Sequence, residues 1–224
     1  MPGYVEESLE IDGWVFRQRL PQGAGPHPVV LMLHGWTGDE NAMWVFASRL
    51  PAEAMLLAPR GLYRTPYGGY GWHPHQAKSW PWIDDFQPSI EALQLILTEE
   101  YFPRADFSDL SLLGFSQGAA LSFSYGLLFP YEVHLLAGLS GFLPDGAQAL
   151  ARNRPLVDKN VFMAHGIQDD LVPVNKARQA VGLLEEAGAK VTYCEDDVGH
   201  KLSRSCFRGL QVFFSKHQNQ TVKD

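Results

Sequence analysis

The sequence has only two cysteines, Cys194 and Cys206, among its 224 residues. Two cysteines are too few for a disulfide scaffold, and their spacing does not match that of a metal-ligand motif. We therefore expect two reduced thiols in a cytoplasmic protein. The first seven residues agree with that location, because they are acidic and lack the basic segment and apolar run of a secretory signal.

Long apolar runs and an excess of basic residues are lacking too. No stretch approaches the roughly 18 consecutive apolar residues of a membrane span. Lys and Arg number 18 against 25 Asp and Glu, which gives a net charge of −7. Such a balance argues against a nucleic-acid partner. Internal repeats and linkers are also absent, so we expect a single domain over residues 1–224, as a monomer or a homodimer.

What the sequence does contain is an alternation of short apolar runs and helical patterns. Six runs predict strands buried on both faces: residues 28–33, 54–58, 110–113, 133–139, 161–164 and 191–194. Helical patterns lie between and after them: residues 90–101, 173–186 and 207–214. This alternation predicts an α/β fold with a mostly parallel central sheet and helices on both faces. The first twenty residues predict an antiparallel hairpin at the edge.

The strongest chemical signal is the segment Gly114-Phe115-Ser116-Gln117-Gly118. An apolar run precedes it and a helical pattern follows, which is the context of a nucleophile elbow. In that turn the serine hydroxyl stands above the sheet, and the glycines let strand and helix approach. The N–H of Gln117 would begin the helix and stabilise an oxyanion. The alternative is a glycine-rich turn with an ordinary serine.

A nucleophilic serine needs a base, and His200 is the best placed of the eight histidines. It follows the last apolar strand, on a short loop before the final helix. His34 is expected to pack at the end of its strand and shape the next loop, and His134 to be a satisfied buried histidine. His73 and His75 form a His-x-His pair without a third ligand at a telling spacing, so no metal is expected.

The base in turn needs a carboxylate that holds its tautomer. Asp169 and Asp170 both lie on a loop between a predicted strand and a predicted helix. Either one gives the chain order Ser, Asp, His that is typical of this fold class. The other would cap a helix or a turn, and spacing does not choose between them.

Two further segments complete the predicted site. The loop 34–40 after the first buried strand is expected to donate a second oxyanion hydrogen bond, from the N–H of Trp36. Residues 60–86 form a long segment rich in glycine, proline and aromatic residues. We interpret it as a lid or pocket segment, since long loops of compact domains are often functional. The expected pocket walls are Tyr70, Trp72, Trp80 and Trp82; the alternative is an aromatic cluster that only packs the loop.

Taken together, these segments resemble the phospholipase/carboxylesterase family of small α/β hydrolases, which includes bacterial carboxylesterases and acyl-protein thioesterases. The resemblance covers nearly the whole chain and rests on short motifs in a fixed order: Leu33-His34-Gly35 with Gly38-Asp39-Glu40, Ala58-Pro59-Arg60-Gly61, Gly114-Phe115-Ser116-Gln117-Gly118-Ala119, His165-Gly166-Ile167-Gln168-Asp169 with Val172-Pro173, and Gly199-His200. The loop after Gly35 is one residue longer than in the thioesterase branch, and the segment 60–86 has more aromatics than expected.

The resemblance implies an α/β-hydrolase fold and a role for Asp169, rather than Asp170, as the acid. It also implies oxyanion donors at Trp36 and Gln117, and neither metal nor organic cofactor. The expected activity is a serine carboxylesterase acting on a small-molecule ester of short-to-medium acyl length. An acyl-thioesterase or a lysophospholipase on the same site is an alternative. A peptidase, a lactone hydrolase and a non-catalytic ligand-binding homologue are further alternatives.

Overall fold

The computed structural model describes residues 3–74 and 80–217, and its centre is one eight-stranded sheet. The strand order is β1-β2-β4-β3-β7-β8-β9-β10. The strands are β1 (Tyr4–Ile11), β2 (Trp14–Pro21), β3 (His27–Leu33), β4 (Met55–Pro59), β7 (Ala105–Phe115), β8 (Leu135–Leu139), β9 (Asn160–Gly166) and β10 (Lys190–Asp196). A separate small ribbon pairs β5 (Tyr63–Arg64) with β6 (Tyr70–Gly71).

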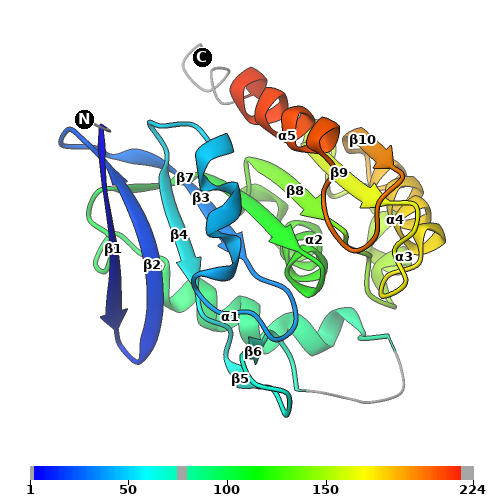
Figure 1. Cartoon of the computed structure of the whole chain (residues 1–224), viewed down its shortest axis with the longest axis horizontal. Helices are drawn as coiled ribbons and strands as arrows, with labels where there is room; N and C mark the ends of the chain where they lie inside the picture. The colour runs from blue at the N-terminus through cyan, green and yellow to red at the C-terminus, as the bar shows by residue number, and fades with distance from the viewer. Residues whose placement is uncertain (1–2, 75–79, 218–224) are drawn as a thin grey trace.

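The sheet is parallel except at one edge. Strands β1 and β2 form an antiparallel hairpin, and β2 pairs antiparallel with β4, whereas β4, β3 and β7 to β10 run parallel. Figure 1 shows the hairpin at one end of the sheet and β10 at the other. The expected antiparallel edge and parallel centre are therefore confirmed, and the buried apolar runs account for the central strands.

Helices cover both faces of the sheet (Figure 1). One face packs against α1 (Gln87–Ile96), α2 (Gln117–Leu128), α3 (Ala147–Ala151) and α4 (Val174–Glu186). The other face packs against the 3-10 helix η1 (Ala42–Arg49) and α5 (Arg204–His217). Two short 3-10 helices, η2 (Ile83–Phe86) and η3 (Pro130–Glu132), complete the described elements. This arrangement is the α/β-hydrolase fold.

Three local predictions differ from the structure. The helical pattern expected to reach Tyr101 ends at Ile96, and the strand expected from residue 133 begins at Leu135. As a result His134 precedes its strand and is only partly buried, with Nδ1 4.0 Å from Asp109 Oδ1. The 3-10 helix η1 was not predicted at all: its buried residues Met43, Phe46 and Ala47 have helical i, i+3, i+4 spacing, but residues 42–47 are an unbroken apolar run in which no polar face marks that period.

The expectation of reduced thiols is wrong: Cys194 and Cys206 form a disulfide. Cys194 lies in β10 and Cys206 in α5, and the two Cα atoms are 5.7 Å apart. Residues 197–203, which include His200, lie between these two elements. The bond therefore joins the strand before the histidine loop to the helix after it.

Among residues 3–74 and 80–217, no helix is both long and apolar enough to cross a membrane.

Candidate active site

Ser116 lies in a sharp turn between the end of β7 and the start of α2. Its backbone angles are φ 54° and ψ −115°, a conformation that non-glycine residues rarely adopt. The turn is held on both sides, because the Ser116 N–H donates to Leu139 O over 2.8 Å and the Ser116 carbonyl accepts from the Ala119 N–H over 3.0 Å. Such strain persists only where the surrounding structure fixes it, and it occurs mostly at functional sites.

The two glycines of this turn are required by close packing. A Cβ on Gly114 would lie 2.1 Å from the carbonyl oxygen of Gly118, and one on Gly118 would lie 2.0 Å from that of Leu33. Both distances are far below van der Waals contact. A side chain at either position would push α2 away from β3 and β7, so the geometry is the strand–turn–helix context predicted from the sequence.

His200 and Asp169 are in direct contact. Nδ1 of His200 lies 2.7 Å from Oδ2 of Asp169. The other carboxylate oxygen, Oδ1, accepts the N–H groups of Leu171 and Val172, each over 2.9 Å. The Asp169 side chain is fully buried, whereas Asp170 is exposed. With the proton on Nδ1 pointing at the carboxylate, Nε2 of His200 is left as the basic nitrogen.

The loops that bear these two residues are joined along their backbones. Ile167 N–H donates to Asp196 O over 2.9 Å, and Gln168 N–H donates to Val198 O over 3.0 Å. A Cβ on Gly166 would lie 2.2 Å from the carbonyl oxygens of both Val198 and Gly199. This close approach of the loops after β9 and β10 explains why residues far apart in sequence meet at the carboxyl edge of the sheet.

His200 also reaches the serine turn. Its ring centroid lies 5.0 Å from that of Phe115, the residue before Ser116, in an edge-on arrangement. The structure thus brings the predicted nucleophile, base and acid to one edge of the sheet.

A second histidine, His165, also contacts Asp169. Nε2 of His165 lies 2.8 Å from Val172 O and 3.4 Å from Oδ2 of Asp169. Burial lowers the pKa of His165 below its usual value, which favours the neutral ring. The sequence motif contained His165, but its contact with Asp169 was not predicted.

The loop after β3 approaches the serine turn through glycine. A Cβ on Gly35 would lie 3.2 Å from Cβ of Ser116, and Gly38 N–H donates back to Gly35 O over 3.0 Å. Trp36 is within this tight turn, directly after the glycine that approaches the serine. Gln117 is the first residue of α2, where backbone N–H groups have no intrahelical acceptor. Both predicted oxyanion donors therefore lie on backbone next to Ser116.

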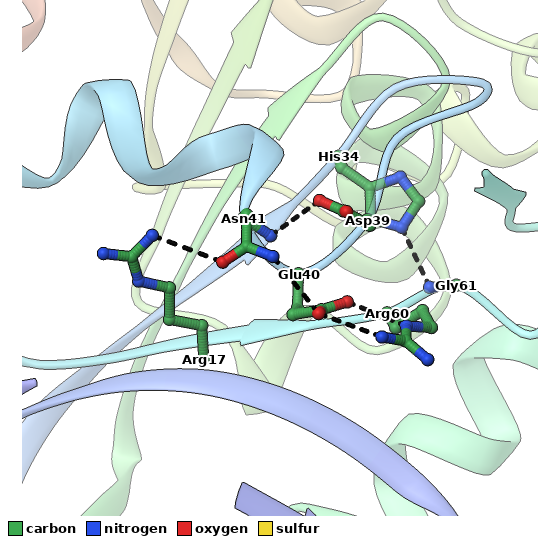
Figure 2. Close-up of polar contacts among 7 residues, drawn as sticks. All are labelled: Arg17, His34, Asp39, Glu40, Asn41, Arg60 and Gly61. Atoms are coloured by element: carbon green, nitrogen blue, oxygen red, sulfur yellow. Dashed lines mark hydrogen bonds and ion pairs between the residues drawn. The ribbon is translucent and has the colours of Figure 1, made fainter. Parts of the chain in front are cut away.

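His34 ties this loop to the start of the aromatic segment, as Figure 2 shows. Its Nε2 accepts the Gly61 N–H over 2.8 Å, and its Nδ1 lies 2.8 Å from Gly35 O. These partners fix the neutral tautomer that has the proton on Nδ1. Burial lowers the pKa of His34, in agreement with a neutral ring. The prediction that His34 packs at the end of its strand and shapes the next loop is confirmed.

Glu40 and Arg60 join the same two segments by an ion pair (Figure 2). Arg60 Nε and Nη2 donate to the two Glu40 oxygens over 2.8 and 2.9 Å. The Arg60 hydrogen bond holds the pKa of the Glu40 carboxyl below its usual value. Glu40 is buried, so this pair is more than a surface contact.

Gln117 makes a further link with its side chain. Its Oε1 accepts the N–H of Trp72 over 2.9 Å, and Trp72 Nε1 donates to His34 O over 2.7 Å. Trp72 has no exposed surface. Trp72 of the segment 60–86 is thus bonded to the end of β3, where the loop with Trp36 begins, and to the start of α2, which bears Gln117.

The other expected pocket walls lie in different places. Trp80 packs edge-on against Phe142, with ring centroids 4.6 Å apart, and Trp82 is 58% exposed. Tyr70 lies under the guanidinium of Arg60, 4.9 Å from the ring centroid. None of these four aromatic residues lines the apolar cavity described next.

An apolar cavity of about 380 Å³ opens beside the serine turn. Its walls come from the loop after β3, from η1, from the residue before Ser116 and from the segment after His200, and they include Trp36, Met43, Phe46, Phe115, Lys201, Leu202 and Phe207. Sequence reasoning missed this cavity, because η1 was not predicted. The apolar run at residues 42–47 is the only sequence signal that pointed to it.

Within residues 3–74 and 80–217, no three His, Cys, Asp or Glu side chains are grouped to hold a metal ion. His73 packs against Trp36 and Phe86, and His75 lies outside the described residues.

The chain is similar to known proteins along most of its length. The family model described as Phospholipase/Carboxylesterase matches residues 21–218. A rice protein (Oryza sativa subsp. japonica) named a probable carboxylesterase is 26% identical over 131 residues, covering 58% of this chain and 49% of that protein. Acyl-protein thioesterase 1 of Kluyveromyces lactis is 26% identical over 178 residues, covering 70% of this chain and 76% of that protein. The crystal structure of the Bacillus cereus carboxylesterase superposes with a TM-score of 0.78 at 24% identity, covering 91% of this chain and 93% of that one.

Proposed function

Because the chain belongs to the phospholipase/carboxylesterase family of ester hydrolases, we propose that it is a serine carboxylesterase. Its substrates are small or short-to-medium acyl esters, and its reacting groups are Ser116, His200 and Asp169. The observation that supports this most strongly is the 2.7 Å contact between His200 and Asp169, next to a serine in a strained turn. A base held in one tautomer beside a nucleophile is what acyl transfer requires.

The proposed reaction has two halves. Nε2 of His200 takes the proton of Ser116 Oγ as that oxygen attacks the acyl carbonyl carbon. The backbone N–H groups of Trp36 and Gln117 hold the negative charge that develops on the carbonyl oxygen. The intermediate collapses, the alcohol departs with the proton from His200, and an acyl-serine remains. Water, deprotonated by the same nitrogen, then attacks the acyl carbon; the bond to Ser116 Oγ breaks, His200 returns the proton to that oxygen, and the acid is released.

The buried carboxylate of Asp169 orients His200 and stabilises its protonated form in both halves. Its other oxygen accepts the Leu171 and Val172 N–H groups, which keeps the carboxylate fixed in position. The neutral His165 beside it adds no competing charge.

Hydrolysis of chromogenic acyl esters of increasing chain length tests the proposal. We expect turnover in the wild type and a loss on the order of 10⁴-fold in Ser116→Ala. Asp170→Asn is a matched control, because Asp170 is exposed and should leave turnover unchanged. Wild-type rates in Ser116→Ala would refute the serine mechanism.

An acyl-thioesterase is the second candidate, supported by the similarity to acyl-protein thioesterase 1. The same serine would attack a thioester and an oxygen ester. The ratio of their turnover rates, measured for one acyl chain, therefore distinguishes an acyl-thioesterase from a carboxylesterase. A lysophospholipase activity is tested with a lysophospholipid of that chain. A non-catalytic binding protein would hydrolyse none of these and would not react with an organophosphonate.

The cytoplasmic location expected from the sequence stays a proposal. Disulfides such as Cys194–Cys206 are rare in reducing cytosol and persist in oxidising compartments. Alkylation of free thiols in freshly lysed cells, before and after reduction, decides between the cytoplasm and an oxidising compartment. Thiols that react without prior reduction support the cytoplasm.

A further inference from the structure

A second cavity, of about 410 Å³, lies between η1 and α5, and three arginines line it. Arg49 comes from η1, and Arg204 and Arg208 come from α5. Arg204 and Arg208 are one helical turn apart and therefore lie on the same face of α5. Arg49 reaches the same face from the other side, where its Nη1 donates to Gln211 Oε1 over 3.3 Å.

This arginine cavity adjoins the apolar cavity beside Ser116. Val45 and Phe207 line both of them. Lys201, which directly follows His200 and precedes α5, also lines the apolar cavity. The cavity beside the predicted reaction centre and the cavity with the three arginines therefore meet at Val45 and Phe207.

The three arginines have no acidic partners among residues 3–74 and 80–217, where no carboxylate lies within ion-pair distance of them. In contrast, Arg17, Arg60 and Arg178 each pair with a glutamate. Arg49, Arg204 and Arg208 are exposed to solvent, so an anion can reach all three from outside. An anion bound among them would gain the attraction of three positive charges that no carboxylate of the described residues pairs with.

We propose that the two cavities form one binding site for an ester that carries an anionic oxygen group at the end of an apolar chain. The chain lies in the apolar cavity, and a carboxylate or phosphate lies among Arg49, Arg204 and Arg208. Arginine suits these groups, because its planar fork donates two parallel hydrogen bonds to two oxygens. The proposal rests on the proposed function for the ester bond and adds the chemistry of the substrate's far end.

The helix α5, which bears two of the three arginines, is held firmly in place. Cys206, between the two arginines in sequence, bonds α5 to β10, and Leu210 and Phe213 bury the opposite face of the helix. Arg204 and Arg208 therefore project from a helix that is anchored both covalently and by packing, which limits the ordering cost of binding.

Binding is tested first, without turnover, by calorimetric titration of octanoate, octyl phosphate and neutral octanol. We expect the anions to bind about tenfold or more tightly than octanol. Comparison of octanoate with octyl phosphate identifies which anion the site prefers. The double variant Arg204→Gln/Arg208→Gln should abolish the advantage of the anions, whereas Arg152→Gln/Lys216→Gln, which removes two charges elsewhere, should retain it. Equal affinities of the anions and octanol, or an unchanged advantage in the Arg204→Gln/Arg208→Gln variant, would overturn the proposal.

Turnover is then compared for matched esters. The 4-nitrophenyl half-ester of octanedioic acid and the 4-nitrophenyl ester of octanoic acid differ only at the far end of the acyl chain. Acetate esters of 8-hydroxyoctanoic acid and of octanol make the same comparison on the alcohol side. A lower KM for the charged member of either pair, lost in Arg204→Gln/Arg208→Gln, supports the proposal, and no preference in both pairs contradicts it. Failure of the proposed function is distinct, because none of the four esters would then be hydrolysed while the binding results stand.

A third variant tests the connection between the cavities. Val45 is 63% exposed and lines both, so Val45→Trp should fold and narrow the passage. We expect it to raise KM for the octanedioate half-ester more than KM for acetate esters of short alcohols. Unchanged KM for the half-ester would show that its chain does not pass Val45.

Discussion

The side-chain oxygen of Gln117 accepts a hydrogen bond of 2.9 Å from the backbone N–H of Trp72. Gln117 directly follows Ser116, and its own N–H is a proposed oxyanion donor. The residue after the nucleophile therefore also anchors the aromatic segment. Since Trp72 Nε1 in turn donates to the carbonyl oxygen of His34, the same tryptophan supports the loop with the other proposed donor.

Replacement of Gln117 by leucine should affect both stability and rate. The Trp72 N–H is buried and would lose its acceptor, which costs about 1–3 kcal/mol of unfolding free energy. We expect kcat to fall about tenfold although both oxyanion N–H groups remain, because their positions loosen. Urea unfolding and ester hydrolysis measure the two effects. Gln179→Leu, on the exposed face of α4, is the control, and a Gln117→Leu protein that matches it would refute the anchoring role.

Two buried neutral histidines make stability depend on pH. Burial lowers the pKa of both His34 and His165 in the folded chain, whereas the unfolded chain titrates near the ordinary value of about 6.5. Below that pH the unfolded state binds more protons than the folded state, so the free energy of unfolding falls as pH decreases. We expect lower urea midpoints at about pH 5 than at about pH 7, and a weaker dependence in His165→Gln. Equal wild-type midpoints at the two values would contradict this.

The pair of Glu40 and Arg60 should matter more than a surface ion pair. Arg60→Met leaves the carboxylate of Glu40 buried without the two hydrogen bonds from Arg60, so that only the 3.2 Å hydrogen bond from Asn41 Nδ2 remains. Because Arg60 itself is partly exposed, we expect a loss of about 1–3 kcal/mol of unfolding free energy, below that of a fully buried pair. The double variant Glu40→Leu/Arg60→Met should be more stable than Arg60→Met alone. If the double variant is the less stable of the two, the buried charge is not the cause.

The Cys194–Cys206 bond should contribute measurably to stability. The two residues are 12 apart in sequence, and closing a loop of that size removes chain entropy from the unfolded state. We expect reduction, or the double variant Cys194→Ser/Cys206→Ser, to lower the free energy of unfolding by about 2–4 kcal/mol. Dithiothreitol should shift the urea midpoint of the wild type and leave that of the double variant unchanged. A wild-type midpoint that does not respond to reduction would contradict the contribution of the bond.

The sequence predicted the parts of this site that depend on local chemistry. The elbow around Ser116 needs glycines at fixed positions between a strand and a helix, and that pattern is visible in the sequence. His200 follows a strand on a short loop, which again is local. The choice of Asp169 over Asp170 came from the family resemblance, and the structure places Asp169 against His200.

Features that depend on packing between distant elements were not predicted. The disulfide requires β10 and α5 to lie side by side, and two isolated cysteines give no sign of that. The arginine cavity joins Arg49 to Arg204 and Arg208 through the packing of η1 on α5, and the continuous apolar run in η1 hides its helical period. Trp72 was expected at a pocket wall because it is aromatic and lies in a long loop. Its indole N–H instead donates within the core.

Covalent labelling with a fluorophosphonate, followed by peptide mass spectrometry, shows directly whether Ser116 is a nucleophile activated by His200. We expect one adduct, on Ser116, that is absent from Ser116→Ala and strongly reduced in His200→Ala. A folded wild-type protein that takes no label, or a label that persists in Ser116→Ala, would contradict it.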